Sequence, residues 1–187
     1  DGKVTISRAA GTMTFPADFV LIAAMNPCPC GYFGDPAREC RCSPVQIERY
    51  RNRISGPLLD RIDLHVEAPA VAFKELSGVG HAEPSSAIRG RVLAAREVQK
   101  ARFAGGRKTA SNARMTHSQI KKFCVLDETS TEMLRHAMED LHLSARAYDR
   151  ILKVARTIAD LGGSERIESS HIGEAIQYRT LDRRLWA

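Results

Sequence analysis

The sequence predicts an α/β unit over residues 1–76, followed by an all-helical unit. Three observations carry this prediction. Residues 19–24 form a continuous apolar run, which is typical of a strand buried on both faces of a sheet. Residues 77–86 are rich in Gly, Pro and Ser and predict a linker. Beyond the linker, apolar residues recur at helical rather than alternating spacing.

The first predicted element of the α/β unit is a β-hairpin. Residues 3–8 alternate and are rich in β-branched side chains, and Gly11 marks the turn. The apolar run at 19–24 is the next predicted strand, and it ends at Asn26, which precedes a proline. A cysteine-rich loop then leads to Cys42.

The rest of this unit is predicted to contain a helix, a turn and a second strand. Ser43 and Pro44 are typical N-cap and N1 residues, so a helix is expected to begin there. Residues 55–61 predict a turn with a short helix. Residues 62–67 alternate up to Pro69 and predict a strand.

The helical unit is predicted to begin with a long basic helix at 86–104, which Gly105 and Gly106 stop. We divide this part of the chain into a linker with its connecting helix, 77–114, and a helical domain, 115–187. Three further helices are marked by apolar residues at helical spacing around 134–141, 147–158 and 172–176, the second ending at Gly162 and Gly163.

Composition places the chain among ordinary globular proteins. Its 187 residues are 43% hydrophobic and 27% charged, which excludes the disordered and fibrous classes. The longest apolar run, 19–25, is far shorter than the roughly 20 residues that span a bilayer, and no signal-peptide pattern is present. We therefore expect a cytoplasmic protein without a membrane partner. Because the chain begins at Asp1 with strand-like sequence, we expect it to be part of a longer protein.

The net charge of +6 comes from one segment. Residues 84–114 carry eight basic residues and one acid, whereas the rest of the chain is close to neutral. A local basic segment is typical of nucleic-acid binding, because neutralised phosphates release counterions. The alternative is a solvated helix face. After the Gly105-Gly106 stop, Arg107 and Lys108 are the residues that we predict to contact phosphates without reading sequence.

Four of the five cysteines form two CxC pairs that are nine residues apart. Thiolates at this spacing can close a tetrahedral Zn²⁺ site. The alternatives are disulfides, which no secretory signal supports, an iron–sulfur cluster, or unligated thiols. No histidine lies inside the loop, which argues against a catalytic zinc with an open position. The fifth cysteine, Cys124, is predicted to be a core residue. The predicted zinc ligands are Cys28, Cys30, Cys40 and Cys42.

Four polar side chains are candidates for phosphate chemistry. Asn26 follows the predicted buried strand, and ligands bind at the carboxyl ends of strands in open α/β sheets. The alternative is an ordinary Asn-Pro turn. Arg61 lies between apolar anchors, and its planar fork suits phosphate as well as a surface ion pair. Arg146 and Arg150 lie one turn apart and face the same side of a helix, as ordinary surface arginines also do.

Four segments together resemble a known family. They are residues 24–31 (AMNPCPCG), 55–65 (SGPLLDRIDLH), 144–160 (SARAYDRILKVARTIAD) and 175–179 (AIQYR). In content and order they resemble the magnesium-chelatase-like AAA+ ATPases of the ComM/YifB type, over essentially the whole chain. The resemblance implies an α/β fold that is the C-terminal part of an AAA+ P-loop ATPase core, followed by an all-helical lid domain.

The resemblance also implies roles for the candidate residues. Asn26 matches the sensor 1 residue that orients the hydrolytic water. Arg61 matches the arginine finger, which reaches the nucleotide of a neighbouring subunit. Arg146 matches the sensor 2 arginine of the lid, and Arg150 is the alternative. The hairpin at 3–15 matches a pre-sensor hairpin, which points into the pore of related helicases. The implied cofactors are ATP and Mg²⁺, and the implied assembly is a homo-oligomeric, hexameric ring.

The P-loop motif Gly-x-x-x-x-Gly-Lys-Ser/Thr is absent from these 187 residues. We therefore expect the chain to begin just past Walker B and not to hydrolyse ATP by itself. Our leading hypothesis is the C-terminal part of an ATP-driven DNA motor, a helicase or branch-migration enzyme in DNA uptake and recombination. The alternatives are a chelatase-type ATPase that remodels a protein, and a zinc-stabilised binding or oligomerisation module.

Overall fold

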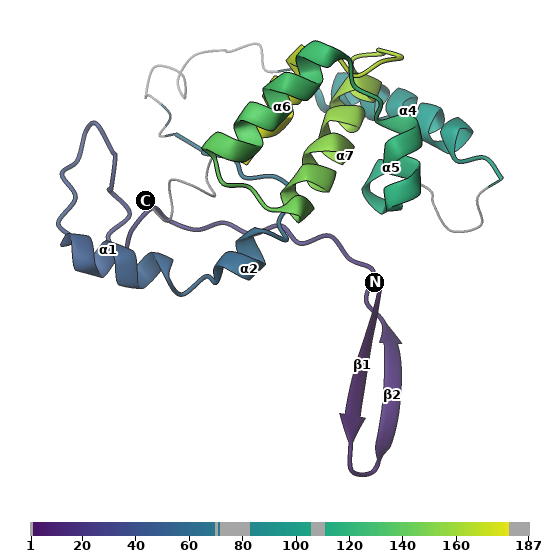
Figure 1. Cartoon of the computed structure of the whole chain (residues 1–187). Helices are drawn as coiled ribbons and strands as arrows, with labels where there is room; N and C mark the ends of the chain where they lie inside the picture. The colour runs from purple at the N-terminus through teal and green to yellow at the C-terminus, as the bar shows by residue number, and fades with distance from the viewer. Residues whose placement is uncertain (1, 70, 72–82, 106–110, 180–187) are drawn as a thin grey trace. The chain divides into compact units, whose positions relative to one another are not determined.

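The computed structural model describes residues 2–69, 71, 83–105 and 111–179 (Figure 1). The chain divides into two compact units, Asp1–Arg51 and Asn52–Ala187. Within the described ranges, no helix combines the length and the apolar character that a membrane span requires.

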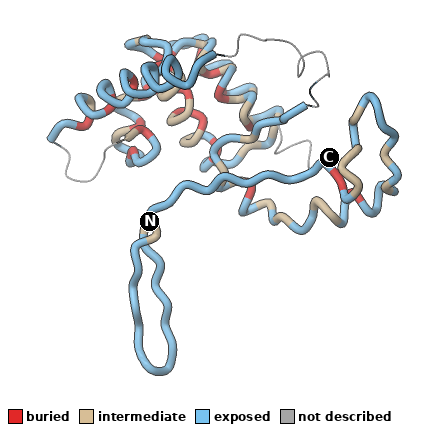
Figure 2. The backbone as a smooth tube through the Cα atoms, turned by 180° about the vertical axis from the view of Figure 1, so that it is seen from behind, coloured by how far each residue is buried: buried red, intermediate tan, exposed pale blue. Residues whose placement is uncertain are grey.

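The first unit begins with the predicted hairpin, which is confirmed. Strands β1 (Lys3–Arg8) and β2 (Gly11–Pro16) pair antiparallel, with Val4 opposite Phe15. Every described residue of both strands is exposed (Figure 2). Alternation leaves one face apolar and the other lined by hydroxyls, which pair across the strands as Thr5–Thr14 and Ser7–Thr12, each with oxygens 3.0 Å apart.

The buried strand predicted for residues 19–24 does not form. Phe19, Val20 and Ile22 are 76%, 86% and 91% exposed. The only sheet among the described residues is the β1–β2 hairpin. A strand buried on both faces needs neighbouring strands for its hydrogen bonds and helices for its cover. No described strand pairs with this run, so the prediction of a buried strand is wrong and the run is an exposed apolar segment.

Helix α1 (Pro44–Arg51) begins where the sequence predicts. The Ser43 hydroxyl accepts a hydrogen bond from the Gln46 N–H (3.3 Å), and the Gln46 side-chain oxygen accepts one from the Ser43 N–H (2.9 Å). This reciprocal pair satisfies two backbone donors that have no partner inside the helix. The start of α1 is therefore fixed by local side-chain chemistry.

The second unit begins with the short helix α2 (Gly56–Leu59), as predicted. The strand predicted for residues 62–67 is absent, because no described strand pairs with it. Instead, the N–H of His65 donates to the carbonyl oxygen of Tyr178 at 2.9 Å. The segment therefore lies against the end of α8 (Ser169–Gln177) rather than in a sheet.

The helices of the second unit confirm the long helix and the three predicted after it, and they add η1 and α5. Side-chain oxygens of Thr116, Asp127 and Ser144 cap α5, α6 and α7 by accepting a backbone N–H three residues on. The elements are α4 (Ser85–Arg102), η1 (Asn112–Arg114), α5 (His117–Phe123), α6 (Glu128–Asp140), α7 (Ala145–Leu161) and α8 (Ser169–Gln177).

Helix α7 lies at the centre of the hydrophobic core. Its residues Ile151, Ala155 and Ala159 are fully buried, and Leu134 of α6 and Ile172 of α8 belong to the same cluster. Cys124 is also in this cluster, which confirms it as a core residue. The predicted stop of α7 is confirmed, since its C-cap is Gly162 and Gly163 follows at φ +70°.

Two predicted features lie outside the described residues. These are most of the predicted linker, residues 77–82, and the basic tip, which includes Arg107 and Lys108. The boundaries 1–76, 77–114 and 115–187 stay predictions.

Candidate functional site

The four CxC cysteines form one cluster in the first unit. The Sγ atom of Cys28 lies 3.3 Å from that of Cys30 and 3.7 Å from that of Cys40, and the last two are 3.6 Å apart. With Cys42, all four sulfurs lie within 4.8 Å of one another. Four thiolates bound to one tetrahedral Zn²⁺ at roughly 2.3 Å would lie about 3.8 Å apart. The free thiols therefore have the spacing that a metal ion needs.

Turns and an arginine hold the loop around this cluster. Gly31 and Gly34, at φ +85° and +82°, adopt the left-handed conformation that lets the chain reverse between the two CxC pairs. The Nε of Arg51, on α1, donates to the carbonyl oxygen of Pro27 at 3.4 Å. The same guanidinium lies 5.0 Å from the centroid of the Phe33 ring. The start and the middle of the loop are thus tied to α1.

The thiols differ in acidity. Hydrogen bonds from the backbone of Tyr32 and then Arg41 lower the pKa of the Cys30 thiol to about 6. Desolvation raises the pKa of Cys42 to about 12. Cys30 is therefore a thiolate at neutral pH, which is the form that binds metals. A cation among the sulfurs would favour the thiolate at the remaining positions.

Asn26 lies at the entrance to this loop and is exposed. A Cβ atom built on Gly31 would lie 3.8 Å from Nδ2 of Asn26. The Asn26 amide therefore lies beside the first turn of the cysteine loop.

A second candidate site gathers arginines and carboxylates where the segment after α2 meets α7. The Ser144 hydroxyl, which caps α7, donates to Oδ1 of Asp60 at 2.9 Å. The Nη1 of Arg150 donates to Oδ1 of Asp63. Burial, with the charges of Arg179 and Arg61, lowers the pKa of Arg150, which stays a cation at neutral pH. The start of α7 is therefore joined by charged and polar contacts to the segment that carries Arg61.

Arg179, just beyond the end of α8, completes this site. It is 1% exposed, its Nη1 donates to the carbonyl oxygen of Ile62, and its Nη2 lies 3.6 Å from Oδ1 of Asp60. The next residue towards α8, Tyr178, accepts the His65 N–H. We call Asp60, Arg61, Asp63, Ser144, Arg150 and Arg179 the arginine cluster.

The sequence-predicted arginines are placed differently within this unit. Arg61 is exposed, and its Nη1 donates to the carbonyl oxygen of Pro57 at 2.6 Å. Arg150 belongs to the arginine cluster. Arg146 is exposed and makes no hydrogen bond or ion pair with the part of the chain that the structure describes. The structure thus places Arg150 against the segment that carries Arg61 and leaves Arg146 exposed to solvent.

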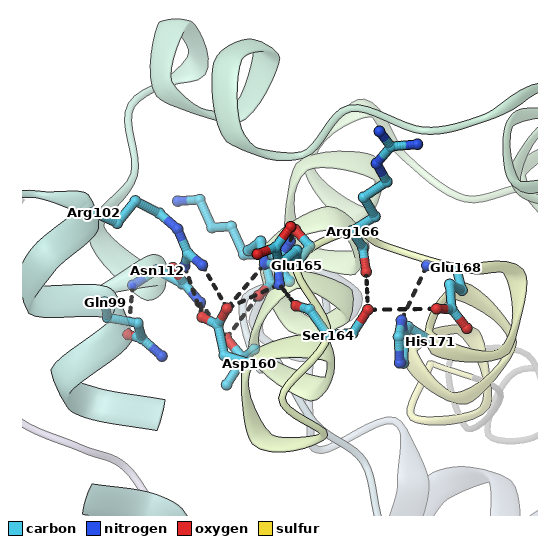
Figure 3. Close-up of polar contacts among 12 residues, drawn as sticks. Gln99, Arg102, Asn112, Asp160, Ser164, Glu165, Arg166, Glu168 and His171 are labelled. Atoms are coloured by element: carbon cyan, nitrogen blue, oxygen red, sulfur yellow. Dashed lines mark hydrogen bonds and ion pairs between the residues drawn. The ribbon is translucent and has the colours of Figure 1, made fainter. Parts of the chain in front are cut away.

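A third polar group lies inside the helical unit (Figure 3). Oδ1 of Asp160 accepts from Nη2 of Arg102 at 2.5 Å, and Oδ2 accepts from Nδ2 of Asn112 at 2.8 Å. The Nε of Arg156 also donates to Asp160, at 3.1 Å. Gln99 accepts the backbone N–H of Asn112 at 3.0 Å. The polar groups of this buried network hydrogen-bond to one another and thereby attach α4 and η1 to α7. Because they are already paired, the network is not a ligand site.

Sequence reasoning missed Arg179 and this network. A signal exists for the network, because Arg102 and Gln99 fall on the helix face that also carries Ala95. Arg179 ends the family-like segment 175–179, but nothing in that segment identifies its partners, which are remote in sequence.

Two family models together match almost the whole chain. The model described as magnesium chelatase, subunit ChlI, matches residues 1–76, and the model described as its C-terminal part matches residues 82–179. The chain therefore belongs to the magnesium chelatase subunit ChlI family, and its fold is related to the AAA+ ATPases. This confirms the family resemblance seen in the sequence.

Curated relatives support the same assignment. The chain is 44% identical over 185 residues to the competence protein ComM of Haemophilus influenzae, and 42% identical over 185 residues to the uncharacterised protein YifB of Salmonella typhimurium. An uncharacterised Mycobacterium bovis protein is 35% identical over 184 residues. These matches cover 96–98% of this chain but 35% of each relative. The chain thus spans about a third of the length of the relatives that it matches.

Proposed function

We propose that this chain supplies the sensor, finger and lid elements of an ATP-driven DNA motor, a cytoplasmic homo-oligomeric ring of six subunits. The observation that carries the proposal is the arginine cluster, in which the lid candidate Arg150 pairs with Asp63, two residues after the finger candidate Arg61, and the Arg61 charge acts on Arg150. Family membership supports ATP dependence. The name of the Haemophilus relative, a competence protein, supports a role in DNA uptake.

Each candidate has a distinct task in this proposal. The exposed guanidinium of Arg61 would stabilise charge on the phosphoryl group transferred in the neighbouring subunit's site, an effect worth roughly 10³–10⁵ in rate. Arg146 or Arg150 would contact the phosphates of the subunit's own nucleotide, and Asn26 would orient the attacking water. ATP and Mg²⁺ would be held by a P-loop outside these 187 residues, so this chain alone would not turn over ATP.

The thiol cluster would hold a structural Zn²⁺. The sulfur spacing supports this, and four thiolates fill the tetrahedron and leave no open position for catalysis. The ion would fix the loop that begins beside Asn26. An iron–sulfur cluster would need the same ligands, and absorption in the visible region distinguishes it from colourless zinc.

The DNA contact is proposed for the basic tip rather than for the whole basic segment. Arg91 is paired with Glu83, with Nη2 and Oε2 2.9 Å apart, and Arg102 is paired with buried Asp160. The charges of Arg91 and Arg102 are therefore already paired with carboxylates of the same chain. Arg107 and Lys108 come five and six residues after the end of α4, beyond the Gly105-Gly106 pair, and we propose them as the residues that reach a phosphate backbone.

A chelatase-type ATPase that remodels a protein is the second candidate, because the matching family models describe a magnesium chelatase subunit. A zinc-stabilised binding or oligomerisation module is the third. DNA binding that weakens steeply with salt would favour the motor, since only a polyanion releases many counterions. Binding that is indifferent to salt, or absent, would favour the other two.

The deciding experiment replaces Arg61 in the full-length ring. Arg61→Ala is expected to abolish ATP hydrolysis while nucleotide binding is retained, because the finger acts across the subunit interface. Arg61→Lys keeps the charge but loses the planar fork, so it should also be strongly impaired. Arg53→Ala, which removes an exposed arginine eight residues earlier, is the control and should hydrolyse normally. Near wild-type turnover in Arg61→Ala would overturn the finger assignment.

A further inference from the structure

The segment that carries Arg61 is held by the helical unit from three directions. Ser144, at the start of α7, donates to Asp60. Arg150, further along α7, donates to Asp63. Beyond α8, Arg179 donates to the Ile62 carbonyl. These contacts join residues that are 84, 87 and 117 positions apart in sequence. They fix both the residue before Arg61 and the residue after it.

Arg179 acts as a brace, by which we mean a buried side chain that holds a neighbouring segment in place. It is 1% exposed, and one guanidinium faces both the Ile62 carbonyl and the Asp60 carboxylate. The planar fork of arginine can meet two acceptors at a fixed angle, which a lysine ammonium cannot do with the same geometry. The adjoining backbone bond from His65 to Tyr178, at 2.9 Å, anchors the far end of the segment.

We propose that Arg179 is a positioning residue for Arg61. It fixes residues 60–63 to the end of α8, while Ser144 and Arg150 join the same residues to α7, so that the finger and the lid move as one body. This rests on the proposed function of Arg61 as a finger. In a ring, a lid that shifts with its own nucleotide would then move the finger that it presents to the neighbouring subunit's site. The device would link nucleotide state in one subunit to hydrolysis in the next.

The test compares Arg179→Lys with Arg156→Lys in the full-length ring. Arg156 is a matched control because it is 3% exposed and also bonds backbone carbonyls, those of Ser164 and Glu165, yet no described contact joins it to residues 60–65. Asp60→Asn is a milder second variant, since it removes the charge paired with Arg179 and keeps an acceptor for Ser144. The two readouts are hydrogen exchange in peptides covering residues 60–66, and steady-state ATP hydrolysis.

We expect Arg179→Lys and Asp60→Asn to speed exchange at 60–66 at least tenfold and to lower kcat by about 10-fold to 100-fold, with KM changed less than about twofold, because a misplaced catalytic group costs rate rather than binding. Arg156→Lys should leave exchange at 60–66 unchanged. Unchanged exchange in Arg179→Lys overturns the brace. Faster exchange with unchanged kcat, where Arg61→Ala is inactive, overturns the positioning role. If Arg61→Ala itself stays active, Arg61 is not a finger, and Arg179 cannot be a positioning residue for a finger. The hydrogen-exchange data would still decide whether Arg179 holds residues 60–63 in place.

Discussion

Arg102 and Asp160 form a two-bond ion pair across 58 residues of sequence, with nitrogen–oxygen distances of 2.7 and 2.5 Å. The carboxylate side chain is fully buried, and Arg102 is 13% exposed. Arg102 ends α4, and Asn112, which begins η1, bonds the same carboxylate. Both flanks of the basic tip are therefore attached to α7 through one side chain.

The first prediction concerns the stability that this pair provides. Arg102→Ala should lower the free energy of unfolding by about 3 kcal/mol, towards the low end for a broken buried pair because Arg156 still bonds Asp160. Arg91→Ala, which removes an exposed pair with Glu83, should cost no more than about 1 kcal/mol. Urea unfolding followed by circular dichroism measures both. Equal losses of unfolding free energy in the two variants would contradict the assignment of Asp160 as the main attachment of α4 to α7.

The second prediction is an acid limb in the stability profile. Burial alone would raise the pKa of Asp160, but hydrogen bonds from Arg102 and Asn112 outweigh it, and the pKa lies below its usual value. A carboxyl with a lowered folded-state pKa stabilises the fold at any pH above its unfolded-state pKa, near 4. That stability is lost as the pH falls below about 4 towards the folded-state pKa. Unfolding measured between pH 2 and 6 should show this limb, and Asp160→Asn should flatten it. A limb that persists unchanged in the variant would assign it to other carboxylates.

The features that the sequence predicts well are those with local causes. The hairpin follows from alternation and a turn, and the helix starts follow from caps such as Ser43 and Ser144, whose partners lie three residues away. The cysteine cluster follows from ligand spacing. Each of these can be recognised within a short window of sequence.

The features that the sequence predicts poorly depend on partners that are distant in the chain. The run at 19–24 has the composition of a buried strand, but a strand also needs neighbours, and the described residues supply none. Residues 62–67 alternate as a strand does, yet their contacts are with Arg150, Tyr178 and Arg179. The segment that ends at Arg179 does not identify the partners of this residue, because they lie 117 and 119 residues earlier. Tertiary contacts of this kind cannot be deduced from spacing alone.

The third prediction concerns the thiol cluster. Protein purified without chelator should carry close to one zinc per chain, with no visible absorption. A thiol-modifying reagent should release the zinc, and Cys28→Ser should lose it. The core of the helical unit should survive this loss, because none of its cluster residues is a predicted ligand. Four freely titrating thiols with clearly substoichiometric metal would refute the zinc site.

The fourth prediction separates the two lid arginines. Arg146→Ala should leave the free energy of unfolding within about 0.5 kcal/mol of wild type, since its side chain is exposed and bonds no described residue. Arg150→Ala should cost about 1 kcal/mol or more, because it breaks the contact with Asp63. If Arg146 contacts the nucleotide, its loss should lower ATP hydrolysis without this structural cost. Hydrolysis that is lost only in Arg150→Ala would assign the phosphate contact to Arg150.

The last prediction concerns DNA. Replacing Arg107 and Lys108 with alanine in the full-length ring should weaken DNA binding equally across sequences, because phosphate contacts carry no base information. Each lost contact should reduce the slope of log affinity against log salt by about 0.9, so the double variant should be shallower by up to about two.

The matched control for this experiment is Lys121→Ala with Lys122→Ala on α5, which removes the same charge from the same unit. If the tip acts only through overall charge, both double variants will weaken binding alike. A salt titration by fluorescence anisotropy compares the two with wild type.

Because α4 and η1 are both tied to Asp160, Asp160→Asn should loosen the attachment of the tip without removing its charge. Asp160→Asn should therefore weaken DNA binding while the slope of log affinity against log salt stays close to wild type. If the slope also becomes shallower, Asp160 affects the number of phosphate contacts.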